Sequence, residues 1–93
     1  MNHQAPRFPL GQVMITPAAQ ALLEQAGVTP QSLLLRHHHG DWGSVCFDDA
    51  CANEHALAQG GRLFSAYIVG TDKVWIITEA DRLYTTLLTP EDY

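Results

Sequence analysis

The residues with the greatest capacity for chemistry are concentrated in one short segment, residues 36–43, directly after the apolar run 33–35. Between and around two glycines, this segment carries the side chains of Arg36, His37, His38, His39, Asp41 and Trp42. Histidine titrates near neutral pH and can take up and return a proton. Arginine can stabilise negative charge on a reacting phosphate. Loops held by a rigid scaffold often carry function, so this segment is the first candidate for a functional surface.

A second pair of charged residues, Glu79 and Arg82, flanks a turn near the C-terminus. If the histidine run lies at the same end of the fold, the two segments would form one cleft. A histidine and Glu79 would exchange protons there, while arginines from both segments would bind phosphate, as in an RNA-cleaving site without a metal ion. The catalytic candidates of this hypothesis are His37, His38, His39, Glu79 and Arg82, with Arg36 as a second phosphate ligand.

Structural roles explain the same residues more simply, and we prefer them to an enzymatic activity. Histidines near the end of a helix interact favourably with its dipole, and Asp41 can accept hydrogen bonds from backbone groups in a turn. An exposed pair of Glu79 and Arg82 would contribute little to stability. Trp42, between two glycines, either covers the core or anchors a partner, whereas Trp75 lies in an apolar run and is expected to be buried or half-buried in the core.

A zinc site is a weaker hypothesis. Cys51 and His55 are four residues apart, and a helix would place them on one face. Cys46 and one of the three consecutive histidines could complete a tetrahedral set. The spacing matches no standard zinc module, and both cysteines can serve as small apolar side chains. We therefore expect no metal ligands and no cofactor.

Size and composition restrict the class of protein. The chain has 93 residues, 46% of them hydrophobic, which fits one ordered domain. The net charge is −5 with only five Lys and Arg, and this scarcity of phosphate-neutralising groups counts against a DNA-coating role. The N-terminal residues lack the apolar segment of a secretory signal, and no run is long enough for a membrane helix. The expected location is the cytoplasm.

Local signals predict three helices. Thr16 before Pro17 and Thr29 before Pro30 are typical helix starts. The first helix is expected to stop at Gly27, the second near Gly40, and the third to run from residue 48 or 49 to the glycines at 60 and 61.

The hydrophobic period then changes to two, which predicts strands over 62–69, 74–79 and 83–89. A short strand over 12–16 is a further expectation. The predicted fold is α+β, with about three helices packed on one face of a three-stranded antiparallel meander. Residues 1–9 are expected to form a flexible tail, and residues 10–93 a single domain.

Three sets of residues resemble, as a group, a family of short bacterial proteins often labelled hypothetical or plasmid-related. The sets are Arg36, His37, Gly40, Asp41, Trp42 and Gly43; Asn53, Ala56, Leu57, Gly61, Arg62, Leu63, Ser65, Ala66 and Tyr67; and residues 75–82 with Thr85, Thr86, Leu87 and Leu88. The resemblance covers nearly everything after Leu10. The chain departs from the family pattern at Leu83, where serine is common, and at Thr89, which separates the final leucines from Pro90.

A weaker resemblance, to barnase-like and RelE-like ribonucleases, rests on helices that precede an antiparallel meander and on residues 78–86. It implies RNA cleavage, but a shared fold does not establish function. The acidic balance of the chain counts against a toxin that binds RNA.

The preferred hypothesis is a small cytoplasmic accessory protein of a mobile element, which binds another macromolecule as a regulator or inhibitor, including inhibitors of restriction or CRISPR systems. The expected binding surface consists of Arg36, His37, His39, Asp41, Trp42, Glu79 and Arg82. A protein is the expected partner, with RNA as the alternative and without a membrane. A homodimer through an edge strand, at 12–16 or 83–89, is compatible with the sequence. A metal-independent ribonuclease and a zinc-stabilised domain are the two alternatives.

Overall fold

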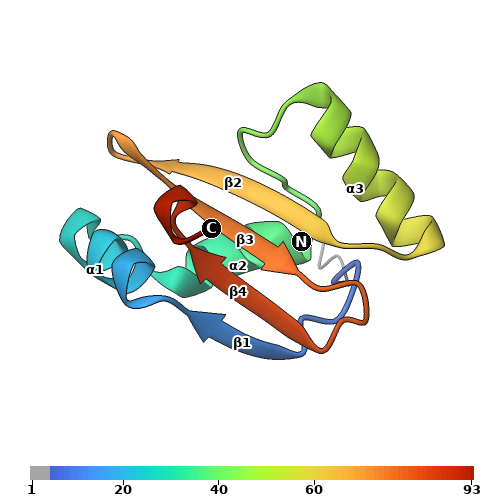
Figure 1. Ribbon diagram of the computed structural model, residues 1–93, viewed down its shortest axis with the longest axis horizontal. Helices are drawn as coiled ribbons and strands as arrows, with labels where there is room; N and C mark the ends of the chain where they lie inside the picture. Colours follow the sequence, from blue (N-terminus) through green and yellow to red (C-terminus); the bar gives the residue numbers. More distant parts are fainter. Residues whose placement is uncertain (1–4) are drawn as a thin grey trace.

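One mixed sheet forms the centre of the protein in the computed structural model, which describes residues 5–93 (Figure 1). The elements in chain order are β1 (Gln12–Ile15), α1 (Pro17–Ala26), α2 (Pro30–His38), α3 (Phe47–Gln59), β2 (Leu63–Val69), β3 (Asp72–Thr78), β4 (Tyr84–Leu88) and the 3-10 helix η1 (Pro90–Asp92). The strands lie in the order β1-β4-β3-β2. The α+β class expected from the sequence is therefore confirmed.

The predicted helix starts are confirmed at the level of individual hydrogen bonds. The side chain of Thr16 accepts a hydrogen bond from the backbone of Ala19, and Thr29 does the same for Ser32. Each cap satisfies a backbone donor that the first helical turn leaves unpaired. Gly27 ends α1 in the left-handed conformation, as expected of a glycine at this position.

The sheet differs from the predicted three-stranded antiparallel meander. Strands β2, β3 and β4 are antiparallel and adjacent in chain order, as their short turns predict, but β1 joins as a fourth strand, parallel to β4. The backbone of Gln12 donates to Leu83 and that of Thr16 donates to Leu87. A strand's side-chain pattern does not identify its hydrogen-bonding neighbour, so the pairing of the first strand with the last was not visible in the sequence.

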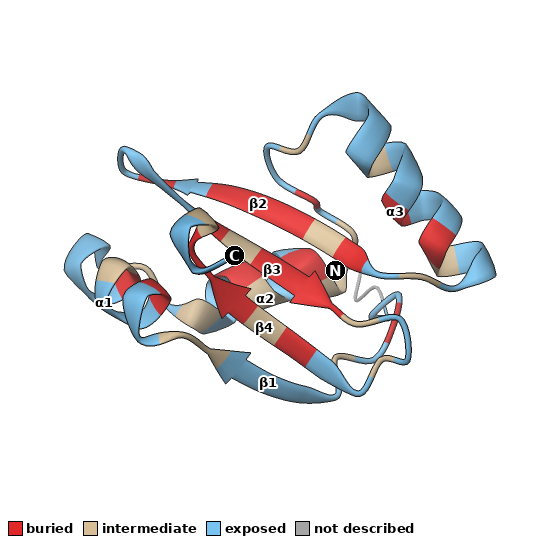
Figure 2. Ribbon diagram, viewed as in Figure 1, coloured by how far each residue is buried: buried red, intermediate tan, exposed pale blue. Residues whose placement is uncertain are grey.

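The helices do not all pack on one face, which corrects a second expectation. Helices α1 and α2 cover one face, where Leu23 and Leu33 join the main core with Tyr67, Val74 and Ile76. Helix α3 lies beside β2, at the edge of the sheet opposite β1 (Figure 1). Only Asn53 and Ala56 of α3 are buried, and Figure 2 shows most of this helix exposed while the sheet is largely buried. So narrow a buried stripe suits the edge of a sheet better than its face.

The packed domain begins before residue 10, the N-terminal boundary that the sequence predicted. Phe8 is buried in a second cluster with Trp42, Ala56 and Leu63. Arg7 forms an ion pair with Glu54 on α3 at 2.7 Å. Residues 7–9 therefore belong to the fold, because the second core cluster needs the Phe8 ring. The remainder of the expected tail includes residues 1–4, which lie outside the described residues.

Candidate functional site

His37 is the most deeply placed of the candidate residues, because its side chain is fully buried between α2 and the sheet. Its Nδ1 atom lies 2.6 Å from Oγ of Ser65, and its Nε2 atom lies 2.9 Å from Oγ1 of Thr78. Thr78 in turn bonds to Thr85, whose hydroxyl donates to the carbonyl oxygen of Leu10. Both ring nitrogens are thus satisfied by other buried groups, as a core histidine requires.

Burial also determines the charge of His37. Loss of solvation lowers its pKa from 6.5 to about 3, with smaller contributions from nearby His38 and Arg82. The ring is therefore neutral at physiological pH. A general acid–base catalyst needs a pKa near the working pH and access to its substrate, and His37 has neither in this arrangement.

The space between the histidine run and the turn at residues 79–82 is occupied by Phe8. Its ring packs edge-on against His37 at 5.1 Å and against His38 at 5.8 Å, and the guanidinium carbon of Arg82 lies 6.0 Å from the same ring. The structure brings the two predicted segments to the same region, with an aromatic side chain between them. His39 lies on the outer side of the run, where its Nδ1 atom bonds to the carbonyl oxygen of Leu35 at 2.9 Å.

The glycine-flanked loop is held by Asp41 and Trp42. One carboxylate oxygen of Asp41 accepts from the backbone of Gly43 at 3.2 Å, and the other accepts from Nε of Arg36 at 2.6 Å. The hydrogen bond from Arg36 holds the pKa of Asp41 below its usual value. Trp42 is buried, and its indole N–H donates to Glu54 at 3.0 Å. Asp41 therefore closes the turn as the sequence predicted, and of the two roles considered for Trp42 the structure shows the one in which it covers the core.

Arg36 is the part of this loop that solvent reaches. About half of its side chain and of Asp41 is exposed, and its guanidinium lies 4.6 Å above the ring of Tyr67. The hydroxyl of Tyr67 donates to the backbone oxygen of Asp41 at 2.6 Å. Arg36 and Asp41 therefore form a rigid exposed pair, in which each charge already has a partner.

Arg82 serves the backbone rather than an open site. Its guanidinium donates to the carbonyl oxygens of Gly61, Glu79, Ala80 and Ala56, and the last of these belongs to the C-terminal turn of α3. Arg82 adopts a backbone φ of 62°, which is unusual for a residue other than glycine. Arg82 thus joins the end of α3 to the β3–β4 turn. Phosphate binding would require it to leave these carbonyl oxygens.

The proposed zinc ligands are not gathered at one place. Cys46 and Cys51 are exposed free cysteines, whereas His37 is fully buried and packs against Phe8. Within residues 5–93 no group of three or more His, Cys, Asp or Glu side chains is arranged to hold a metal ion.

A different surface emerges on the sheet face that α1 and α2 leave uncovered. We call it the aromatic groove; it is a hollow of about 270 Å³ lined by Arg62, Phe64, Trp75, Ile77 and Tyr93. The rings of Phe64 and Trp75 meet edge-on at 5.1 Å, and those of Trp75 and Tyr93 at 5.8 Å. Arg62 donates to the hydroxyl of Tyr93 and to Glu79. Glu79, a residue of the predicted binding surface, therefore borders the groove.

Sequence reasoning missed the groove because it considered Trp75 only as a buried or half-buried core residue and gave no role to Phe64 or Tyr93. The available signal was alternation. Phe64 and Ile68 in one strand, and Trp75 and Ile77 in the next, put apolar side chains on the second face of a sheet that few helices can cover.

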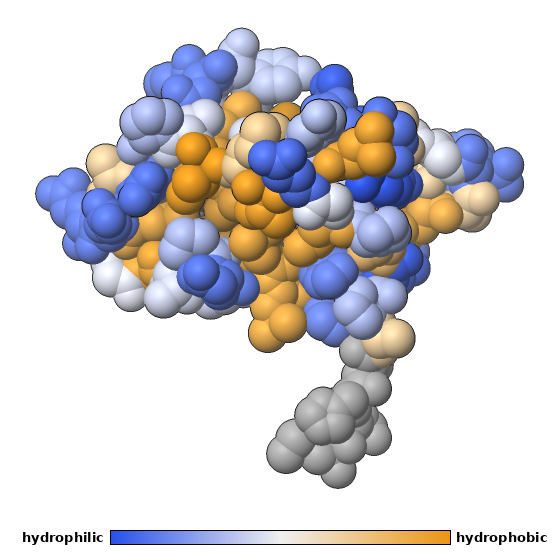
Figure 3. Space-filling view, turned by 90° about the horizontal axis from the view of Figure 1, so that it is seen from below, coloured by the Kyte–Doolittle hydropathy of each residue, from blue (hydrophilic) through white to orange (hydrophobic). Residues whose placement is uncertain are grey.

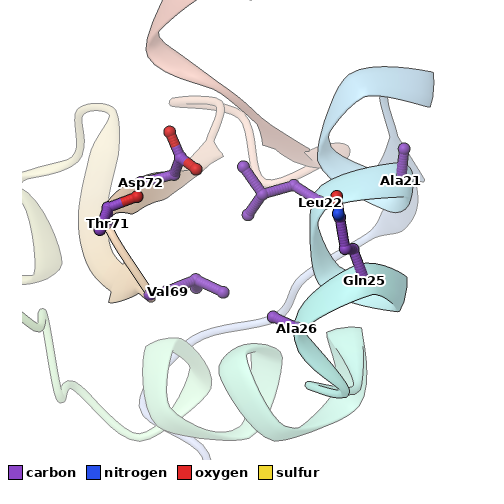
Figure 4. A pocket seen from close by; sticks show the side chains of 8 residues that line it. Ala21, Leu22, Gln25, Ala26, Val69, Thr71 and Asp72 are labelled. Carbon is purple, nitrogen blue, oxygen red and sulfur yellow. The ribbon is translucent and has the colours of Figure 1, made fainter.

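A larger cleft of about 420 Å³ lies between α1 and the β2–β3 turn. Figure 4 shows Leu22 and Val69 directed toward one another across it, with Asp72 near the turn. Its lining includes one carboxylate but no histidine, cysteine or basic side chain, so it offers little for catalysis.

Among residues 5–93, no helix combines the length and the apolar character needed to cross a bilayer. Comparison of the chain with protein-family models, with curated proteins and with solved structures found no match.

Proposed function

We propose that this protein acts by binding another protein, and that the aromatic groove is the principal contact. The observation that carries the proposal is the exposure of aromatic side chains on a sheet face without a covering helix. Tyr93 is 73% exposed and Ile68 is 66% exposed, next to the half-buried rings of Phe64 and Trp75. Contiguous apolar patches of this kind on small proteins mark interaction sites.

The composition of the groove suits a protein partner. Tryptophan, tyrosine and arginine are the residues that most often dominate the energy of protein interfaces, and all three line the groove. The rings already contact one another at fixed angles, so little side-chain freedom is lost when a partner binds. An apolar side chain of the partner would enter the hollow, while Arg62 and Glu79 supply a polar rim.

The state of the catalytic candidates favours binding over ribonuclease activity. His37 is buried with a pKa of about 3, and Arg82 is engaged by four backbone carbonyl groups. Arg36, the second proposed phosphate ligand, is paired with Asp41. RNA cleavage would require all three interactions to be replaced. The regulator or inhibitor of a mobile element therefore remains the class that we propose.

The proposal can be tested by chemical cross-linking and affinity capture of the tagged protein from its native host. Tyr93→Ala should weaken binding on the order of tenfold or more, because an exposed interface tyrosine is lost. Phe47→Ala is the matched control, since Phe47 is an aromatic residue on α3 with 80% exposure outside the groove. The expected result is one protein recovered with wild type and with the control, and depleted with Tyr93→Ala.

Equal recovery of every captured protein with Tyr93→Ala and with wild type would contradict the groove as the contact. Recovery of RNA fragments with uniform cleaved ends, without a protein, would support the ribonuclease alternative instead.

A further inference from the structure

The two edges of the sheet are treated very differently by the rest of the chain. At the β2 edge, the side chain of Asn53 accepts from the backbone N–H of Phe64 at 3.0 Å and donates to its carbonyl oxygen at 2.7 Å. Further along, the backbone of Ala66 donates to Trp42 at 3.1 Å and accepts from Ser44 at 2.7 Å. The outward-facing backbone groups of Phe64 and Ala66 are therefore paired within the protein, and this part of the β2 edge is closed.

The β1 edge is open. Gln12 and Thr16 direct their backbone N–H groups toward β4. By the alternation of a β-ladder, the N–H and carbonyl groups of Val13 and Ile15 point away from the sheet. Within residues 5–93, β1 is the last strand on this side. The outward groups form a short template for another strand.

β1 is only four residues long, and side-chain protection against strand pairing is absent from it. Exposed edge strands commonly carry a lysine, another charge or a proline. Here residues 8–23 contain no charged side chain and β1 contains no proline. Val13 is 42% exposed and Met14 is 40% exposed, and across the ladder they lie opposite Thr85 and Thr86 of β4. Figure 3, which views the molecule from the β1 side, shows an apolar band through the centre with polar groups at both sides.

We propose that β1 pairs with β1 of a second copy of this chain, antiparallel and across a two-fold axis. Val13 would face the partner's Ile15, and Ile15 would face the partner's Val13, with each pair exchanging both backbone hydrogen bonds. Met14 would lie on the axis against its own counterpart. The two four-stranded sheets would then form one continuous sheet.

A second copy fits the β1 edge in its symmetry and in the absence of charge at the contact. Each chain carries a net charge of −5, so two copies repel one another over most approaches. Residues 8–23 provide a contact without like charges. The open groups lie symmetrically about Met14, as an isologous contact requires. Because Asn53 and residues 42–44 close the other edge, pairing ends at a dimer and cannot continue into a fibre.

Sedimentation velocity and native mass spectrometry over a dilution series test this proposal. The expected wild-type mass is twice the 10.3 kDa of one chain. Met14→Lys and Met14→Glu should each raise the dimer dissociation constant by roughly tenfold or more, because like charges meet on the axis. Mixing the two variants should restore a dimer that contains one chain of each. Phe47→Lys, which places the same charge beside the closed edge, should remain dimeric.

A monomeric wild type at all concentrations would overturn the proposal, as would a dimer unaffected by both Met14 variants. Hydrogen exchange gives an independent measurement that needs no substitution. The amides of Val13 and Ile15 should exchange slowly in the concentrated wild type and rapidly on dilution. Rapid exchange at both concentrations would also contradict strand pairing, whatever the stability of the variants.

Discussion

At the scale of single residues, the hydrogen bonds of His37 define which of its nitrogens carries the proton. The carbonyl oxygen of Leu10 can only accept, so Thr85 must donate to it. Thr78 then donates to Thr85, and the Nε2–H of His37 donates to Thr78. The hydroxyl of Ser65 remains to donate to Nδ1. These hydroxyl groups therefore select the neutral Nε2–H form of the ring. They also connect α2 to β2, β3 and β4.

This arrangement predicts a pH dependence of stability. The pKa of His37 is about 3 in the folded protein and 6.5 without the fold. Between these two pH values, His37 binds a proton in the unfolded chain but not in the folded protein. The stability that depends on the neutral His37 side chain is fully present above pH 6.5. As the pH falls from 6.5 toward 3, the free energy of unfolding decreases by up to about 1.4 kcal/mol for each pH unit.

The variant His37→Gln retains a donor and an acceptor but does not titrate. Its free energy of unfolding, measured by denaturant titration between pH 7 and pH 4.5, should depend less steeply on pH than that of wild type. His55→Gln, which removes an exposed histidine of α3, is the matched control for the loss of a histidine. Parallel curves for wild type and His37→Gln would show that His37 is protonated in the folded protein.

At the scale of elements, the segment 40–44 acts as a short extra strand on β2. Gly43 forms an isolated parallel bridge with Ala66 and adopts a φ of 76°. The backbone at Gly43 approaches the sheet so closely that a Cβ atom would collide with the carbonyl oxygen of Ala66 and the ring of Tyr67. The absence of a side chain at Gly43 therefore permits the close contact with β2 that holds Asp41, and the Arg36 side chain bonded to it, in place.

Gly43→Ala should therefore destabilise the protein strongly. Positive φ alone costs roughly 1–2 kcal/mol for a side chain, and displacement of the loop from Ala66 adds the loss of two backbone hydrogen bonds. Gly70→Ala is the matched control, since Gly70 has a φ of 64° but no atom within 4 Å of an added Cβ. In thermal unfolding, the loss of Tm should be clearly larger for Gly43→Ala. Equal losses would mean that only the backbone angle matters at Gly43.

At the scale of the whole molecule, four of the five Lys and Arg side chains bond to partners within the protein. Within residues 5–93, which contain every Lys and Arg of the chain, four arginines are engaged. Their partners are Glu54 for Arg7, Asp41 for Arg36, Glu79 for Arg62 and backbone carbonyl groups for Arg82. A basic surface for a phosphate backbone is therefore lacking in these residues. The molecule instead offers an aromatic face and an uncharged edge.

The stability of the whole domain should not depend on a metal ion. Two buried clusters, around Tyr67 and around Trp42, supply the core, whereas the cysteines are exposed. A chelator such as EDTA should leave the Tm of the purified protein unchanged, since structural zinc normally contributes much of the folding energy of a small domain. Stoichiometric zinc in the protein, with a fall in Tm on chelation, would contradict this expectation.

The sequence by itself determined the local features. Thr16 and Thr29 define helix starts through side-chain bonds within four residues, Asp41 closes its own turn, and the period of two predicts β2, β3 and β4. Each of these depends on contacts between near neighbours in the chain. Tertiary structure decided that β1 lies parallel to β4, that α3 lies at an edge, and that Phe8 enters the core.

Tertiary structure also decided the roles of the candidate site residues. Histidine has the same side chain whether it is a catalyst or a buried bridge, and the difference for His37 comes from Ser65 and Thr78, 28 and 41 residues away. Arg82 likewise acquires its role from the end of α3. Charge, pKa and accessibility depend on neighbours brought together by folding. The sequence could therefore identify the reactive side chains, but only their packing determined which of them are buried and which are exposed.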